Sequence, residues 1–167
     1  LLKALGECGL EGDTIVVFTS DHGDMLGSQG QVRKQKPWDE SIRVPLLVRL
    51  PRESRKGRRV EAPVNTPDLM PTLLGLCGVP VPATAQGDDW SPVARGAAAL
   101  EDNAALIECP TPFGEWTRAR GGREYRGVRT RRHTYVRDLN GPWLLFDNEA
   151  DPYQLDNLAG KPEHAAL

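Results

Sequence analysis

The sequence predicts an α/β chain in which parallel-sheet units come first and an antiparallel sheet comes last. Apolar residues recur at helical spacing over residues 1–8, and a β-branched apolar run over residues 14–19 is typical of a buried strand. This helix–turn–strand order indicates one half of a parallel unit. Near the end, we expect antiparallel strands with a hairpin turn at Asn140-Gly141, over residues 127–136 and 143–146.

Turn-forming residues place the remaining elements. Residues 66–78 are expected to form a helix, with Thr66 as its N-cap and Gly78 as its stop. The apolar spacing predicts that the buried face of this helix consists of Met70, Leu73, Leu74 and Cys77. Short apolar runs predict two more strands, and Pro- and Gly-rich stretches predict surface connections; the strands are residues 44–50 and 104–109, and the connections are 79–103 and 110–124.

Composition narrows the class of protein. The chain has 167 residues and a net charge of -2, so it is long enough for a sizeable core. A net charge this close to zero disfavours a nucleic acid or a membrane surface as a general binding partner. Its cysteines are not spaced as a metal or disulfide motif, and we expect Cys8, Cys77 and Cys109 to be small buried residues.

A polar motif directly follows the first predicted strand. Asp21 and His22 stand side by side at the carboxyl end of that strand, which is where open α/β sheets bind their ligands. The simplest interpretation of such a motif is a polar turn. However, residues 20–43 form a long loop, and a loop of that length in a compact domain is usually functional.

Three ordered blocks resemble the sulfatase family of the alkaline phosphatase superfamily. The first is Ser-Asp-His-Gly-Asp-Met-Leu-Gly at residues 20–27, and Lys34 follows 12 residues after the histidine. The second is Trp-Asp-Glu-Ser-Ile-Arg-Val-Pro-Leu at residues 38–46, and the third comprises the closing segments within residues 125–158. The resemblance runs from about residue 1 to about residue 163 and is weakest over 84–124.

The resemblance implies an alkaline-phosphatase-like sheet portion followed by a small C-terminal antiparallel sheet with a helix. It divides the chain into residues 1–83, the C-terminal part of the catalytic domain with the metal and sulfate loop, and residues 84–167, a connection followed by the antiparallel subdomain. The family's nucleophile is a Cys or Ser in a Cys/Ser-x-Pro-x-Arg motif, converted to formylglycine in its N-terminal half. No such motif occurs here. We therefore expect a C-terminal fragment that does not turn over substrate alone and whose partner is the missing N-terminal part.

The same resemblance assigns the site residues. Asp21 and His22 would bind a divalent ion, calcium first, with manganese or magnesium as alternatives. Lys34 would contact the sulfate group of a sulfated small molecule or glycan, as a catalytic and substrate-binding residue; Lys36 is its nearby competitor. For either lysine the plain alternative is a solvated loop charge, and for Asp24 a turn role is favoured.

Neighbouring residues have simpler interpretations. Trp38 is expected to pack rather than line a pocket, and Arg43 is expected to pair with Asp39 or Glu40. Two other functions stay open on the residues alone. One is a phosphodiesterase or phosphonate monoester hydrolase of the same superfamily, and the other is a non-catalytic module that retains the fold.

Overall fold

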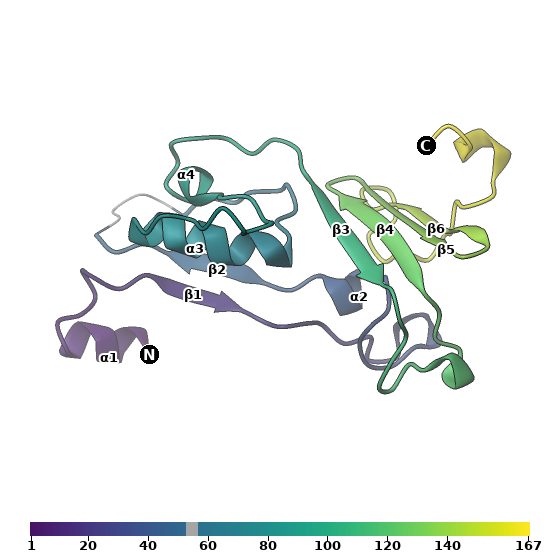
Figure 1. Cartoon of the computed structure of the whole chain (residues 1–167), viewed down its shortest axis with the longest axis horizontal. Helices are drawn as coiled ribbons and strands as arrows, with labels where there is room; N and C mark the ends of the chain where they lie inside the picture. Colours follow the sequence, from purple (N-terminus) through teal and green to yellow (C-terminus); the bar gives the residue numbers. More distant parts are fainter. Residues whose placement is uncertain (53–56) are drawn as a thin grey trace.

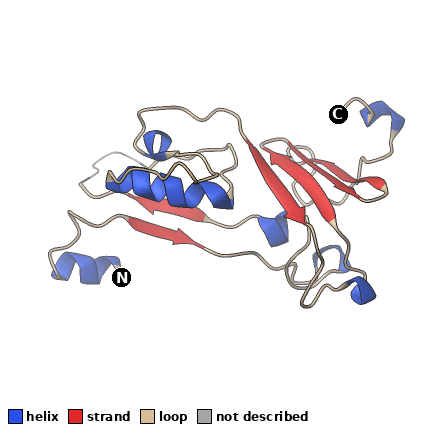
Figure 2. Cartoon of the chain, viewed as in Figure 1, coloured by secondary structure: helices blue, strands red, loops and turns tan. Residues whose placement is uncertain are grey.

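The computed structural model describes residues 1–52 and 57–167, which form two sheets placed one after the other along the molecule (Figure 1). The two-stranded sheet contains β1 (Val16–Thr19) and β2 (Leu46–Arg49), and the four-stranded sheet has the order β3-β4-β5-β6. Figure 2 shows the longer helices beside the first sheet and a short helix on the connection between the two sheets. No helix in the described ranges is long and apolar enough to cross a membrane.

The first sheet is antiparallel, so the expectation of a parallel unit is wrong for these strands. After α1 (Leu2–Glu7), strand β1 pairs with β2 in the register Val17↔Val48. The intervening loop contains only η1 (Ser28–Gly30) and the one-turn α2 (Asp39–Ile42). A parallel return requires a crossover of a dozen or more residues, usually a helix packed on the sheet. This loop instead extends from the end of β1 toward the second sheet and comes back through α2 into β2, which lies beside β1 (Figure 1).

The helix expected at 66–78 is present as η2 (Thr66–Asp68) followed by α3 (Leu69–Cys77), and left-handed Gly78 ends it at φ 70°. Its N-cap is Asn65 rather than Thr66, because the Asn65 side chain accepts from Thr66 N while Asp68 accepts from Asn65 N in a capping box.

The expected buried face of α3 is wrong for three of its four residues, because Met70, Leu73 and Cys77 are exposed and only Leu74 is half-buried. The buried residues of α3 are Pro71 and Leu76. The segment that follows the helix covers the opposite face: Trp90 N donates to Thr72 Oγ1 at 2.9 Å. That segment contains α4 (Ser91–Ala94), a short helix within a stretch expected to be a plain connection.

The C-terminal sheet is antiparallel throughout, as expected. It consists of β3 (Ala104–Cys109), β4 (Tyr125–Thr130), β5 (His133–Asp138) and β6 (Gly141–Asp147). The single strand expected over 127–136 is two strands, because the chain turns at Arg131 and Arg132, where His133 N donates to Thr130 Oγ1 at 2.9 Å. The turn that joins β5 to β6 lies at Leu139-Asn140, one residue before the expected Asn140-Gly141. Gly141 instead begins β6, where its φ of 123° favours a glycine. The chain ends with η4 (Pro162–His164).

The main core lies against the four-stranded sheet and is rich in aromatic side chains. Trp38 of the first loop packs edge-on against Trp143 of β6, with their ring centroids 5.6 Å apart, so its expected packing role is confirmed. All cysteines are free, but only Cys109 is buried; the expected burial of Cys8 and Cys77 is wrong. The buried residues of this core are Cys109, Trp116, Tyr125, Val136, Leu144 and Phe146.

Candidate functional site

The polar motif at residues 20–27 begins where β1 ends, and Gly23 within it packs closely against the backbone of α2. Gly23 N donates to Ser41 O at 2.9 Å. A Cβ atom on Gly23 would lie 2.0 Å from Glu40 O, a distance that no side chain tolerates. Only glycine therefore lets the loop approach the backbone of α2 this closely. The same helix holds the lysine segment, because Lys36 N donates to Ser41 Oγ at 3.2 Å.

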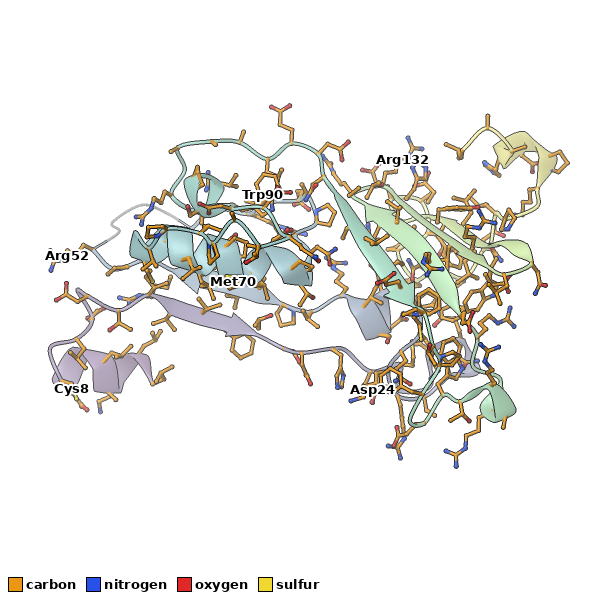
Figure 3. The ribbon with its side chains drawn as sticks, in the orientation of Figure 1. Cys8, Asp24, Arg52, Met70, Trp90 and Arg132 are labelled. Atoms are coloured by element: carbon orange, nitrogen blue, oxygen red, sulfur yellow. The ribbon has the colours of Figure 1, made fainter. Side chains whose placement is uncertain are left out.

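Asp24 folds the loop back on itself, as its expected turn role requires. Its Oδ1 accepts from Leu26 N at 2.9 Å and from Arg33 N at 3.0 Å. Met25, beside it, is completely buried and anchors the loop. Figure 3 labels Asp24 where this loop approaches the C-terminal part of the chain.

The loop also carries backbone strain. Several of its non-glycine residues have a positive φ, an arrangement that costs on the order of 1–3 kcal/mol each and tends to occur at functional sites; they are Leu26, Gln29, Arg33 and Gln35.

The side chains of Asp21 and His22 are in contact, and a hydrogen bond to Gly23 orients the His22 imidazole. Nδ1 of His22 lies 2.8 Å from Gly23 O, which can only accept, so Nδ1 carries the proton and donates. In the neutral imidazole Nε2 is then the acceptor nitrogen, and it lies 3.3 Å from Asp21 Oδ2. The other oxygen of Asp21 accepts from His22 N at 3.0 Å. A carboxylate oxygen and an imidazole lone pair thus face the same point.

Lys34 joins this pair, and Lys36 does not. Lys34 Nζ lies 2.9 Å from His22 Nε2, which places the ammonium, the imidazole and the carboxylate in one group. Lys36 is buried, donates to Lys34 O at 3.1 Å, and lies 5.2 Å from the ring centroid of Trp116. Its contacts hold the backbone of Lys34 in place, whereas the Lys34 side chain faces solvent beside His22.

The surroundings keep the Asp21 carboxylate ionised. Desolvation acts to raise the pKa of Asp21, but the neighbouring His22 and the hydrogen bonds from His22 N and Ser20 outweigh it, so the pKa lies below its ordinary value. Burial lowers the pKa of Lys36, and the charges of Asp24 and Glu115 oppose that shift.

The donor set fits two ligand positions of a divalent cation. Asp21 Oδ2 is a hard oxygen donor and His22 Nε2 offers an unprotonated nitrogen, a combination that suits calcium or magnesium and leaves manganese open. Within the described ranges, no group of three or more His, Cys, Asp and Glu side chains could hold a metal ion. Among the described residues, Asp21 and His22 are thus two donors without a third acidic, cysteine or histidine side chain grouped with them.

A cleft of about 370 Å³ opens beside the group, and we call it the site cleft. Its wall facing the loop comes from a distant segment that contributes Phe113, Gly114 and Glu115. Sequence patterns assigned that segment only to a connection, and no motif there indicated a site. The loop side of the cleft is lined by His22, Asp24, Arg33, Lys34 and Gln35.

A polar network fixes α2, and with it the site, to the C-terminal sheet. Both carboxylate oxygens of Asp39 accept from Arg129 of β4 at 2.9 Å, and Asp39 N donates to Gln154 Oε1 at 2.8 Å. Buried Gln154 also donates to Thr134 Oγ1 at 3.1 Å. Arg43 lies 3.6 Å from Asp39, which confirms their expected pairing.

Comparison with known proteins gives consistent relatives. A family model described as N-sulphoglucosamine sulphohydrolase, C-terminal, matches residues 27–167. An ulvan-active sulfatase of Formosa agariphila is 44% identical over 173 residues, which cover 100% of this chain and 33% of that protein. The chain spans about a third of the length of the curated relatives it matches.

Solved structures agree with this similarity. A structure described as a complex with its substrate D-glucosamine-2-N,6-O-disulfate matches 99% of this chain and 34% of that chain, with a TM-score of 0.82 and 29% identity. A phosphonate monoester hydrolase of Agrobacterium radiobacter matches the same shares, with a TM-score of 0.79 and 30% identity. The expected α/β fold, an alkaline-phosphatase-like portion followed by an antiparallel sheet, is confirmed.

Proposed function

We propose that this chain, which belongs to the N-sulphoglucosamine sulphohydrolase C-terminal family, forms the C-terminal part of a metal-dependent sulfatase. The intact enzyme would hydrolyse the sulfate ester of a glycan or small molecule through a formylglycine supplied by the rest of the protein. The observation that carries the proposal is the convergence of Asp21, His22 and Lys34 at the edge of the site cleft. The 44% identical relative, described as an ulvan-active sulfatase, supports a glycan substrate.

Asp21 and His22 would hold the divalent cation, calcium first, with magnesium or manganese as alternatives. When bound, such an ion neutralises charge on the ester oxygens and so favours nucleophilic attack. The Nδ1–H of His22, held by Gly23 O, presents the Nε2 lone pair outward, and Asp21 Oδ2 faces the same point. The remaining ligands would come from outside this chain.

Lys34 would bind the sulfate group. Its ammonium now donates to His22 Nε2, the same lone pair that would serve a cation. When that lone pair is engaged otherwise, the ammonium is free to donate to a sulfate oxygen. A compact ammonium on a flexible stem suits this change of partner. The buried Lys36, which donates to Lys34 O, keeps the backbone of Lys34 at the cleft throughout.

The test is the Lys34→Ala variant of the intact enzyme, assayed with 4-nitrophenyl sulfate. Loss of a charged donor to an anionic transition state is expected to lower kcat/KM by about 10²-fold or more. Lys161→Ala is the matched control, because Lys161 pairs with Asp156 and neither residue lines the cleft, so its loss should leave the rate unchanged. An unaltered kcat/KM in Lys34→Ala would reject the assignment.

A phosphonate monoester hydrolase is the second candidate, because a structure of that activity matches nearly the whole chain at a TM-score of 0.79. The same cation and ammonium would suit a phosphonate oxyanion equally well. Initial rates of the intact enzyme on 4-nitrophenyl sulfate and on 4-nitrophenyl phenylphosphonate separate the two, and mass mapping of the nucleophile peptide reports whether it carries formylglycine. Hydrolysis of neither ester would favour a non-catalytic module.

A further inference from the structure

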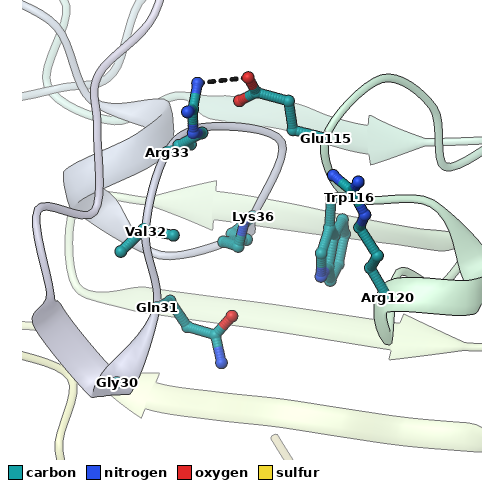
Figure 4. A pocket seen from close by; sticks show the side chains of 8 residues that line it. All are labelled: Gly30, Gln31, Val32, Arg33, Lys36, Glu115, Trp116 and Arg120. Atoms are coloured by element: carbon teal, nitrogen blue, oxygen red, sulfur yellow. Dashed lines mark hydrogen bonds and ion pairs between the residues drawn. The ribbon is translucent and has the colours of Figure 1, made fainter.

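A second cavity, of about 340 Å³, lies beside the site cleft, and we call it the distal cavity (Figure 4). The side chains that matter for its chemistry are Gln31, Arg33, Lys36, Glu115, Trp116 and Arg120. The two cavities share Arg33 and Glu115, whose side chains form an ion pair. Figure 4 shows this pair joined above the cavity, with Lys36 and Trp116 below it. A ligand in the site cleft can therefore reach the distal cavity past one ion pair.

The distal cavity has more cations than carboxylates. Arg33, Lys36 and Arg120 line it with Glu115 as the one acidic side chain, and Glu115 is already paired with Arg33. Arg120, in the short helix η3 (Arg118–Arg120), is exposed and has no carboxylate partner within residues 1–52 and 57–167. Its neighbour Arg118 differs, because it is paired with Glu124. The lining is thus electropositive and has an unused guanidinium.

Lys36 gives a second, independent indication of an anionic ligand. Only 4% of this residue is exposed, and its Nζ donates to Lys34 O, with no carboxylate in ion-pair distance among the described side chains. A buried ammonium without a direct ion-pair partner is costly, and the charges of Asp24 and Glu115 offset that cost only from a distance. The face of Trp116, with its centroid 5.2 Å from Nζ, compensates in part. An anion in the cavity would complete the compensation.

We propose that the distal cavity binds a second sulfate group of the same substrate whose reacting sulfate lies at Lys34; this inference rests on the proposed function. Arg120 is the principal donor, because its planar guanidinium can hold two oxygens of one sulfate at once. Lys36 supplies a fixed positive charge at the base of the cavity. The enzyme would therefore prefer glycans that carry sulfate at two positions over singly sulfated ones.

The test compares D-glucosamine-2-N,6-O-disulfate with D-glucosamine-6-O-sulfate on the intact enzyme. Both are measured as inhibitors of 4-nitrophenyl sulfate hydrolysis and, separately, as ligands by calorimetry. The wild type should bind the disulfate about tenfold more tightly, the size of one charge-assisted hydrogen bond. Arg120→Ala should reduce that preference to less than about twofold, while Arg118→Ala, the matched control outside the cavity, should keep it. Glu115→Gln, which removes the carboxylate, should increase it.

Equal affinities in the wild type, or an undiminished preference in Arg120→Ala, would overturn the distal site. The calorimetric measurement separates this result from a failure of the proposed function. If the wild type releases sulfate from no ester yet binds the disulfate more tightly through Arg120, then the sulfatase assignment fails and the anion site stands. If it hydrolyses 4-nitrophenyl sulfate without preferring the disulfate, the anion site fails alone.

Discussion

At the scale of single residues, the geometry of the site depends on Gly23, which has no side chain and takes no part in the chemistry. Gly23→Ala would place a methyl group 2.0 Å from Glu40 O, so the loop or α2 must move. We expect the free energy of unfolding to fall by about 1–3 kcal/mol, as in other overpacked sites, and His22 to lose its position. Urea unfolding of the intact protein measures the loss. Gly12→Ala is the control, because its Cβ would meet only the Arg52 side chain at 3.5 Å; equal losses would refute the steric explanation.

The ligand role of Asp21 is also a residue-scale prediction. In the intact protein, calcium should raise the melting temperature, and at about 100 times Kd the added stability is about 2.7 kcal/mol. Asp21→Asn removes the carboxylate charge that the surroundings favour, so the calcium-dependent shift should shrink or vanish. Asp13→Asn is the matched control, because this exposed aspartate pairs with Arg52 outside the site cleft. A full calcium shift in Asp21→Asn would exclude this carboxylate as a ligand.

At the scale of elements, α2 joins the site loop to the C-terminal sheet through one largely buried ion pair. Arg129 and Asp39 are 15% and 14% exposed at their side chains, so Arg129→Ala leaves a carboxylate with reduced solvation. We expect a loss of about 3 kcal/mol in unfolding free energy. Arg126→Ala, on the same strand but 62% exposed, should cost less than about 1 kcal/mol. Similar losses in both variants would show that the network does not anchor α2.

At the scale of the whole molecule, the first sheet exposes large apolar side chains. Phe18 of β1 and Leu47 of β2 are 61% and 62% exposed, and Met70 of α3 is 49% exposed. An apolar surface of this kind typically marks an interface. Since the chain spans a third of its relatives' length, we expect this surface to bind a hydrophobic dye strongly in the chain expressed alone and weakly in the intact protein. Phe18→Ser with Leu47→Ser should reduce dye binding by the isolated chain. Weak binding by the unaltered isolated chain would contradict this expectation.

Short sequence patterns predicted the positions of helices, strands and turns well, but predicted poorly which of these elements pack against one another. The loop glycines, the cap at Gly78 and the turn before β6 are features of a few consecutive residues, so sequence alone located them. The direction of β2 and the exposed face of α3 depend on which surfaces meet across the fold. Apolar spacing predicts which residues share a helix face but not which surface that face packs against. For this reason Met70 and Leu73 were expected to be buried, whereas they are exposed.

The sequence by itself determined the family resemblance, the loop that follows β1, and Asp21, His22 and Lys34 as candidates, because these residues lie within one short segment. Only the tertiary structure decided which lysine joins His22, since Lys34 and Lys36 are two residues apart and differ in what they pack against. It also brought Glu115, Trp116 and Arg120 to the loop from a segment without any motif. The physical reason is that the residue type alone determines the charge of a side chain, whereas the folding and packing of the whole chain determine which residues surround it.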